Sequence, residues 1–84
     1  MPEIVVGRIS DYFSHIMVAG VDLNAPLHVG DKLHILGHTS DIEMNVDSMQ
    51  IDHEDAAQAG AGDSVGIRVP QRVRRGDMVY LVKP

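Results

Sequence analysis

The stretch Val29-Gly30-Asp31-Lys32-Leu33-His34-Ile35 joins a glycine turn to a segment in which apolar and polar residues alternate. Alternation with a period of two is typical of a strand buried on one face, so Leu33 and Ile35 are expected to point into a core. Glycine permits the positive φ angle of a tight turn, and the following aspartate can accept a hydrogen bond from a nearby backbone amide. The stretch therefore predicts a strand that begins directly after a turn.

The same turn recurs at Ala61-Gly62-Asp63 and at Arg75-Gly76-Asp77, and an aliphatic residue again follows two positions after each aspartate. The three turns are unequally spaced, which indicates that the same short turn motif is used independently three times and argues against a structural repeat. Arg75-Gly76-Asp77 is also an adhesion tripeptide of extracellular proteins. Its likeness to the other two turns predicts that here it opens a strand.

The rest of the chain also favours strands, because apolar residues recur with a period of two in short segments separated by turns. One predicted strand, 42–52, changes phase between Val46 and Met49, which predicts a β-bulge near Asp47 and Ser48. Helix is expected at most as a single turn in the alanine-rich segment 54–62. The six predicted strands are 4–10, 16–21, 32–37, 42–52, 65–69 and 78–82.

The predicted fold is all-β, a small six-stranded antiparallel barrel, since closure removes the exposed edges of short strands. One domain is expected over residues 1–84, because two separate cores would each be too small to fold without disulfides or metal. The residues expected in the core are Leu33, Ile35, Val46, Met49, Val65, Ile67 and Val79.

The composition excludes several kinds of chemistry. The chain contains no cysteine, so disulfides, Cys-ligated zinc and thiol nucleophiles are excluded. No apolar run approaches the roughly 20 residues that span a bilayer, and no secretory signal is recognisable at the N-terminus, so a cytoplasmic protein without membrane contact is expected. The net charge of −5 opposes a simple polyanion binder.

Four blocks of the sequence form a further pattern, and they run from Leu27 to Ile35, from Val46 to Gln50, from Ala59 to Ile67 and from Val73 to Val79. Together they resemble the second domain of the translation GTPases, the β-barrel that follows the G domain in elongation factor Tu. The resemblance implies a stand-alone barrel of the elongation-factor domain 2 type and a non-enzymatic module that docks to a protein partner or to the ribosome. Because no G-x-x-x-x-G-K-[ST] loop is present, we expect no GTP binding.

In tRNA-carrying members of that family, one surface of the barrel holds the aminoacylated 3′ end of tRNA. By the resemblance, the pocket positions fall on Gln50 and His53. Gln50 can hydrogen-bond a base edge or a ribose, and His53 can stack or, when protonated, meet a phosphate. The resemblance thus leaves open a module that binds tRNA or rRNA.

Four arginines form a second candidate surface, the basic strip of Arg68, Arg72, Arg74 and Arg75. Arg68 is expected to flank the other three if the last two strands pair as a hairpin. Guanidinium groups suit both phosphates and acidic protein patches, so the strip is a candidate contact surface for either partner. The alternative is a solvated charged face.

Tyr12 and Phe13 form the third candidate surface, an aromatic pair in a predicted loop. The pair could anchor a partner or stack a base, or one ring could close the end of the barrel. The five histidines show no ligand spacing, so no metal or other cofactor is expected. No nucleophile elbow or convergent carboxylate pair is recognisable, so the chain is not expected to be an enzyme.

Three interpretations remain open at this level. The first is the docking module, the second is the RNA-binding module, and the third is a severed domain that acts with a separate G-domain chain or another enzyme. Salt-dependent binding of tRNA would favour the second interpretation over the other two.

Overall fold

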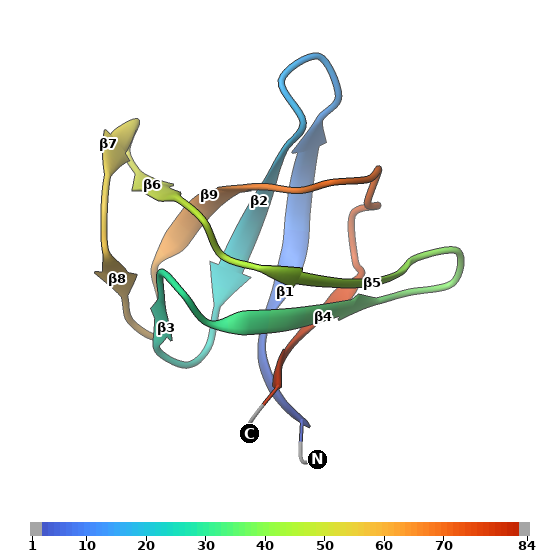
Figure 1. Cartoon of the computed structure of the whole chain (residues 1–84), viewed down its shortest axis with the longest axis horizontal. Helices are drawn as coiled ribbons and strands as arrows, with labels where there is room; N and C mark the ends of the chain where they lie inside the picture. The colour runs from blue at the N-terminus through green and yellow to red at the C-terminus, as the bar shows by residue number, and fades with distance from the viewer. Residues whose placement is uncertain (1–2, 83–84) are drawn as a thin grey trace.

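The computed structural model describes residues 3–82, which form an all-β fold (Figure 1). The prediction of an all-β, antiparallel structure is confirmed, since every strand pair is antiparallel. No helix that could cross a membrane is found in the described range. The strands are β1 (Glu3–Phe13), β2 (Val18–Leu23), β3 (Leu27–His28), β4 (Lys32–Leu36), β5 (Asp41–Asn45), β6 (Met49–Ile51), β7 (Glu54–Asp55), β8 (Gln58–Ala59), β9 (Ser64–Arg68) and β10 (Met78–Val82).

Eight of these strands form one sheet in the order β5-β4-β10-β1-β2-β9-β6-β7, and β3 pairs with β8 in a second sheet. β5 and β6 follow each other in the chain, yet they lie at or near opposite ends of the large sheet. The short connection between them requires that the sheet curl, as Figure 1 shows. The 11-residue strand β1 contributes to this curvature, since its register shifts between Val5 and Gly7 and again between Ile9 and Asp11.

The core lies inside the curled sheet, and the residues predicted for it are all buried: Leu33, Ile35, Val46, Met49, Val65, Ile67 and Val79. The predicted phase change is confirmed, because Asp47 and Ser48 are both exposed between the buried side chains of Val46 and Met49. The bulge itself is replaced by a break in the strand. β5 pairs with β4 and β6 pairs with β9, so the break carries the chain from one part of the sheet to another.

The alanine-rich segment 54–62 does not form the helical turn that its composition allowed. It contains β7 and β8 instead. Ala59 is buried and pairs with Leu27, and Gln50 of β6 pairs with Asp55 of β7. These pairings provide hydrogen-bond partners for backbone groups of the segment. A single isolated helical turn would provide fewer of them.

The three glycine–aspartate turns are the same structure used three times. Gly30, Gly62 and Gly76 have φ angles of 97°, 90° and 94°. The carboxylate of each following aspartate accepts a hydrogen bond from the amide three residues earlier, at 2.8 to 3.0 Å. Each glycine amide also donates to a distant carbonyl, that of Val46, Leu23 or Ile9. Each turn therefore ties a new strand to a residue of the buried core.

The Arg75-Gly76-Asp77 turn opens β10, as predicted. Asp77 is 6% exposed, its carboxylate accepts a hydrogen bond from the amide of Arg74 at 3.0 Å, and a Cβ atom at Gly37 would overlap that carboxylate. A carboxylate held in this way serves the fold and is not displayed to a receptor.

Candidate functional site

Two of the sequence-predicted candidate surfaces meet in one groove. The groove has a volume of about 390 Å³ and is lined by Phe13 from β1 and by Gln50 and His53 from the β6–β7 hairpin. These residues are far apart in the sequence, and the sheet order β1-β2-β9-β6 brings them to the same outer surface. We call this depression the hairpin groove, and its complete lining is Ser10, Asp11, Phe13, Ile16, Val18, Gly20, Gln50, Asp52, His53, Ser64, Val65 and Gly66.

The floor of the hairpin groove is a transverse row across four strands. Asp11 pairs with Gly20, Gly20 with Gly66, and Gly66 with Gln50. The neighbours of the two glycines along their strands are buried, so the glycine positions face outward. The two adjacent glycines contribute no side chains to the middle of the row, and the space above them is narrowed by their neighbours. Ser10 Oγ lies 3.0 Å from the position of a Cβ atom at Gly20, and Cγ1 of Val18 lies 3.4 Å from that of one at Gly66.

One wall of the groove is apolar and belongs to the β1–β2 hairpin. Phe13 is 43% exposed and Ile16 is 51% exposed, and Val18 lies beside them. The predicted loop at Tyr12 and Phe13 is instead the end of β1. The two rings differ in their surroundings, since Tyr12 packs against the core and donates to the sulfur of Met17, whereas Phe13 lines the groove.

The opposite side of the groove is polar and carries one carboxylate. It contains Asp52 and His53 at the β6–β7 turn, and Gln50, whose Nε2 donates to Asp55 at 3.2 Å. Asp11 lies at the other end of the transverse row and forms an ion pair with Arg75 at 3.6 Å. The groove therefore combines exposed hydrophobic side chains with carboxylates at two positions.

The two turns that border the hairpin groove have an unusual backbone. Met17 in the β1–β2 turn has a φ angle of 57°, and Asp52 and His53 in the β6–β7 turn have φ angles of 52° and 66°. Among residues 3–82, these are the non-glycine residues with positive φ. Such a conformation costs roughly 1–2 kcal/mol for a residue such as methionine, whereas aspartate and histidine adopt it more readily than most residues.

The basic strip is divided. The hairpin expected between the last two strands is not formed, because β9 pairs with β2 and β6 while β10 pairs with β1 and β4. Strand pairing therefore does not bring Arg68 close to the other arginines. Arg68 lines a separate depression together with Glu43 and Asp47. Arg72, Arg74 and Arg75 remain together in the loop before β10, which we call the basic loop.

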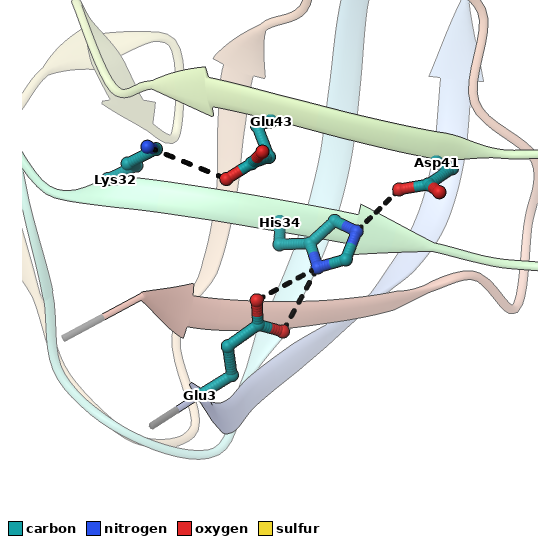
Figure 2. A network of polar contacts seen from close by, with 5 residues as sticks. All are labelled: Glu3, Lys32, His34, Asp41 and Glu43. Atoms are coloured by element: carbon teal, nitrogen blue, oxygen red, sulfur yellow. Dashed lines mark hydrogen bonds and ion pairs between the residues drawn. The ribbon is translucent and has the colours of Figure 1, made fainter. Parts of the chain in front are cut away.

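A cluster around His34 was not predicted from the sequence (Figure 2). Nδ1 of His34 lies 3.0 Å from a carboxylate oxygen of Glu3, and Nε2 lies 2.6 Å from Oδ1 of Asp41. The hydrogen bond to Asp41 first, and that to Glu3 second, raise the pKa of His34 above its ordinary value. Because the carboxylates contact opposite ring nitrogens, the three groups form a chain and do not converge on one point. Within residues 3–82, no group of three potential ligands is placed to hold a metal ion.

Comparison with known proteins gives two relatives that are named as proteolytic enzymes. No family model matches the chain. An uncharacterized protease of Methanocaldococcus jannaschii is 39% identical over 82 residues, and a collagenase of Porphyromonas gingivalis is 30% identical over 80 residues. The alignments cover 96% and 93% of this chain but 20% and 19% of the relatives, so the chain spans about one fifth of their length.

Two solved structures share the fold. Both are structures of the C-terminal domain of a Geobacillus thermoleovorans protein described as a U32 peptidase, one of them a selenomethionine variant. Their TM-scores are 0.86 and 0.88, and they cover 90% and 94% of this chain and 96% and 92% of their own. At identities of 14% and 13%, this likeness is one of fold.

These matches contradict the resemblance to the translation GTPases and the translation-factor-like docking function that it implied. The curated relatives are named as proteases, and the solved domains belong to a protein described as a U32 peptidase. The resemblance was misleading because three of its four blocks contain the glycine–aspartate turn, a local solution that many antiparallel sheets can use. The expectation that the chain is not an enzyme is contradicted by the same protease names.

Proposed function

We propose that the chain is a peptidase-associated domain of the U32 kind, and that its hairpin groove holds a segment of polypeptide. The observation that carries this proposal is the extent of the matches. Nearly the whole chain aligns with one fifth of two proteins named as proteases, and nearly the whole chain superimposes on a domain that was solved by itself. Cleavage of a peptide bond would be an activity of a whole protein of this kind.

The geometry of the hairpin groove supports a polypeptide ligand. Its volume of about 390 Å³ lies within the range of about 300–1,000 Å³ that is usual for ligand sites. The two glycines of the floor lie between the side chains of Ser10 and Val18, and Ser10, Ser64 and Gln50 supply hydrogen-bonding groups at its margin. Phe13 and Ile16 offer an apolar surface to a side chain.

The test is binding of the chain to immobilised heat-denatured collagen, chosen because one relative is named a collagenase. We expect Phe13→Ser to weaken binding strongly, since it removes the aromatic wall of the groove. Leu36→Ser is the matched control, because Leu36 is 40% exposed, close to the 43% of Phe13, and does not line the groove. Absence of binding by the unaltered chain, or an equal loss in both variants, would contradict the proposal.

We also propose, as the finer description of the fold, that residues 1–84 are a single domain whose curled sheet is a six-stranded barrel. Its strands would be β1, β2, β4, β9, β10 and, counted as one, β5 with β6. The proximity of β5 and β6 in the chain supports this description.

A cytoplasmic location and the absence of GTP binding stay predictions. Binding of a protein partner or of tRNA or rRNA also stays a prediction, and oligonucleotides are therefore included in the experiments below.

A further inference from the structure

We infer that the hairpin groove selects extended polypeptide segments in which an apolar side chain and a lysine or arginine are two positions apart. This inference rests on the proposed function and adds a substrate class to it. Its basis is the combination, in one groove, of an exposed apolar wall, a floor that contains two glycines, and two carboxylates. Asp11 lies at the β1 end of the transverse row, and Asp52 lies in the turn that follows Gln50 at the β6 end.

The first step is the length of the groove. Asp11 lies on β1, and Asp52 follows β6, with β2 and β9 between them. Three strand spacings of about 4.8 Å separate β1 from β6, or about 14 Å, and an extended chain covers this distance with about four residues. A short extended segment therefore matches the row, whereas a folded protein surface would contact only its rim.

The second step is charge. Asp11 and Asp52 line the groove, and Asp22 lies beside it, where its Oδ1 accepts a hydrogen bond from Ser64 at 2.7 Å. Asp11 is shared with Arg75 at 3.6 Å, whereas Asp52 projects from the tip of an exposed turn. Carboxylates in this arrangement attract a cationic side chain and repel a phosphate backbone, so a basic peptide is favoured over RNA.

The third step is the spacing of the ligand side chains. In an extended chain, residues two positions apart lie on the same face at a separation of about 7 Å. With one side chain against Phe13 and Ile16, the backbone of the next residue on that face lies about halfway along the row. The long side chain of a lysine or arginine then covers the remaining distance to Asp52. The intervening side chain points away from the groove into solvent, so its identity should matter little.

The fourth step is the backbone of the β6–β7 turn. Two-residue hairpin turns with positive φ at both positions favour glycine at the second one, and His53 occupies that position here. The unfavourable conformation keeps an imidazole at the rim, next to Asp52. Glycine would be the more favourable residue for the turn alone, and histidine at this position offers a ring to a ligand.

The test uses fluorescein-labelled peptides of about 12 residues with a central Phe-Ser-Lys, Phe-Ser-Glu or Ser-Ser-Lys, measured by fluorescence anisotropy at low ionic strength. We expect the Phe-Ser-Lys peptide to bind best, and loss of either the lysine or the phenylalanine to weaken binding. Asp52→Asn should lower the affinity for Phe-Ser-Lys roughly 3- to 5-fold, the effect of one exposed ion pair, and should remove the preference over Phe-Ser-Glu.

Asp47→Asn is the matched control, since it makes the same change in net charge at an exposed residue that does not line the groove. Asparagine also tolerates positive φ, so Asp52→Asn is expected to keep the turn. Equal binding of Phe-Ser-Lys and Phe-Ser-Glu would overturn the charge selection while leaving polypeptide binding intact. Failure of every peptide together with denatured collagen would overturn both proposals, and displacement of the peptide by a single-stranded oligonucleotide at lower concentration would favour RNA instead.

Discussion

Two groups of turns in this molecule solve the same backbone problem with different residues. The glycine–aspartate turns place Gly30, Gly62 and Gly76 at positive φ, whereas the turns around the hairpin groove place Met17, Asp52 and His53 there. The first group costs the fold little, because glycine has no Cβ atom to strain. The second group accepts strain and keeps side chains at the rim of a groove. The comparison separates turns that serve the fold from turns that serve a surface.

The largest expected effect concerns the aspartate of the first group. Asp77→Ala removes the acceptor for the amide of Arg74 in a buried setting, and should lower the free energy of unfolding by about 2–3 kcal/mol. Asp31→Ala removes the same hydrogen bond at a site where the side chain is 29% exposed, and should cost about 1 kcal/mol or less. Urea unfolding of both variants measures the difference, and equal losses would show that burial does not distinguish the turns.

The second prediction is that substitutions at positive φ change the free energy of unfolding in opposite directions in the two groups of turns. His53→Gly should raise the free energy of unfolding by roughly 0.5–1 kcal/mol, since it relieves positive φ at a residue with a Cβ atom. The same variant should bind the Phe-Ser-Lys peptide more weakly. Gly62→Ala is the control, because no atom lies within 4 Å of the added Cβ atom and only the backbone strain at φ +90° remains.

Gly62→Ala should therefore destabilise the fold by about 1–2 kcal/mol and leave peptide binding unchanged. Chemical denaturation and anisotropy on the same samples give both quantities. A His53→Gly variant that is less stable than the unaltered chain would contradict the view that His53 is kept at a cost to stability.

The glycine–aspartate turns were predictable because their chemistry is local. Glycine and aspartate act within four residues, so the sequence alone indicates the positive φ of Gly30 and the hydrogen bond made by Asp31. The phase change at Asp47 and Ser48 was predictable for a similar reason, since it depends only on alternation along one segment.

The hairpin groove was predicted only in parts. Phe13, Gln50 and His53 were each named as candidates, but their meeting depends on the strand order β1-β2-β9-β6, which no local pattern specifies. The prediction of a hairpin between β9 and β10 was wrong for the same reason, since the two strands are not neighbours in the sheet. The extent of β1 was also missed, because its two register shifts interrupt the period of two.

The third prediction concerns the His34 cluster, whose contribution should depend on pH. Because the pKa of His34 is raised in the folded chain, protonated His34 stabilises the fold fully below the ordinary histidine pKa of about 6.5. The stabilisation is lost as the pH rises through the raised pKa. The difference in Tm between the unaltered chain and His34→Asn should therefore be larger at a pH near 5.5 than at one near 8.5.

His38→Asn serves as the control for this experiment, since His38 is an exposed residue outside the cluster. The effect is expected to be modest, because the carboxylate partners are partly exposed to solvent. A difference in Tm that grows toward alkaline pH would show that neutral His34 is the stabilising form.

The smallest expected effect joins the basic loop to the hairpin groove. Arg75 is the residue of the loop that contacts a groove carboxylate, at 3.6 Å from Asp11, and the two side chains are 77% and 50% exposed. An ion pair so exposed contributes little to stability, so Arg75→Ala should leave Tm nearly unchanged, as should replacement of Arg72, Arg74 and Arg75 together. Release of Asp11 from Arg75 should nevertheless make the groove more attractive to a cation.

Arg75→Ala is therefore expected to strengthen binding of the Phe-Ser-Lys peptide by up to about 2-fold, and the gain should vanish at high salt. Arg72→Ala removes the same charge from the same loop without the contact to Asp11, so it separates the local ion pair from the net charge. Equal gains in the two variants would assign the effect to long-range charge. A gain confined to Arg75→Ala would place Asp11 at the ligand, because only there does removal of an arginine expose a carboxylate of the groove.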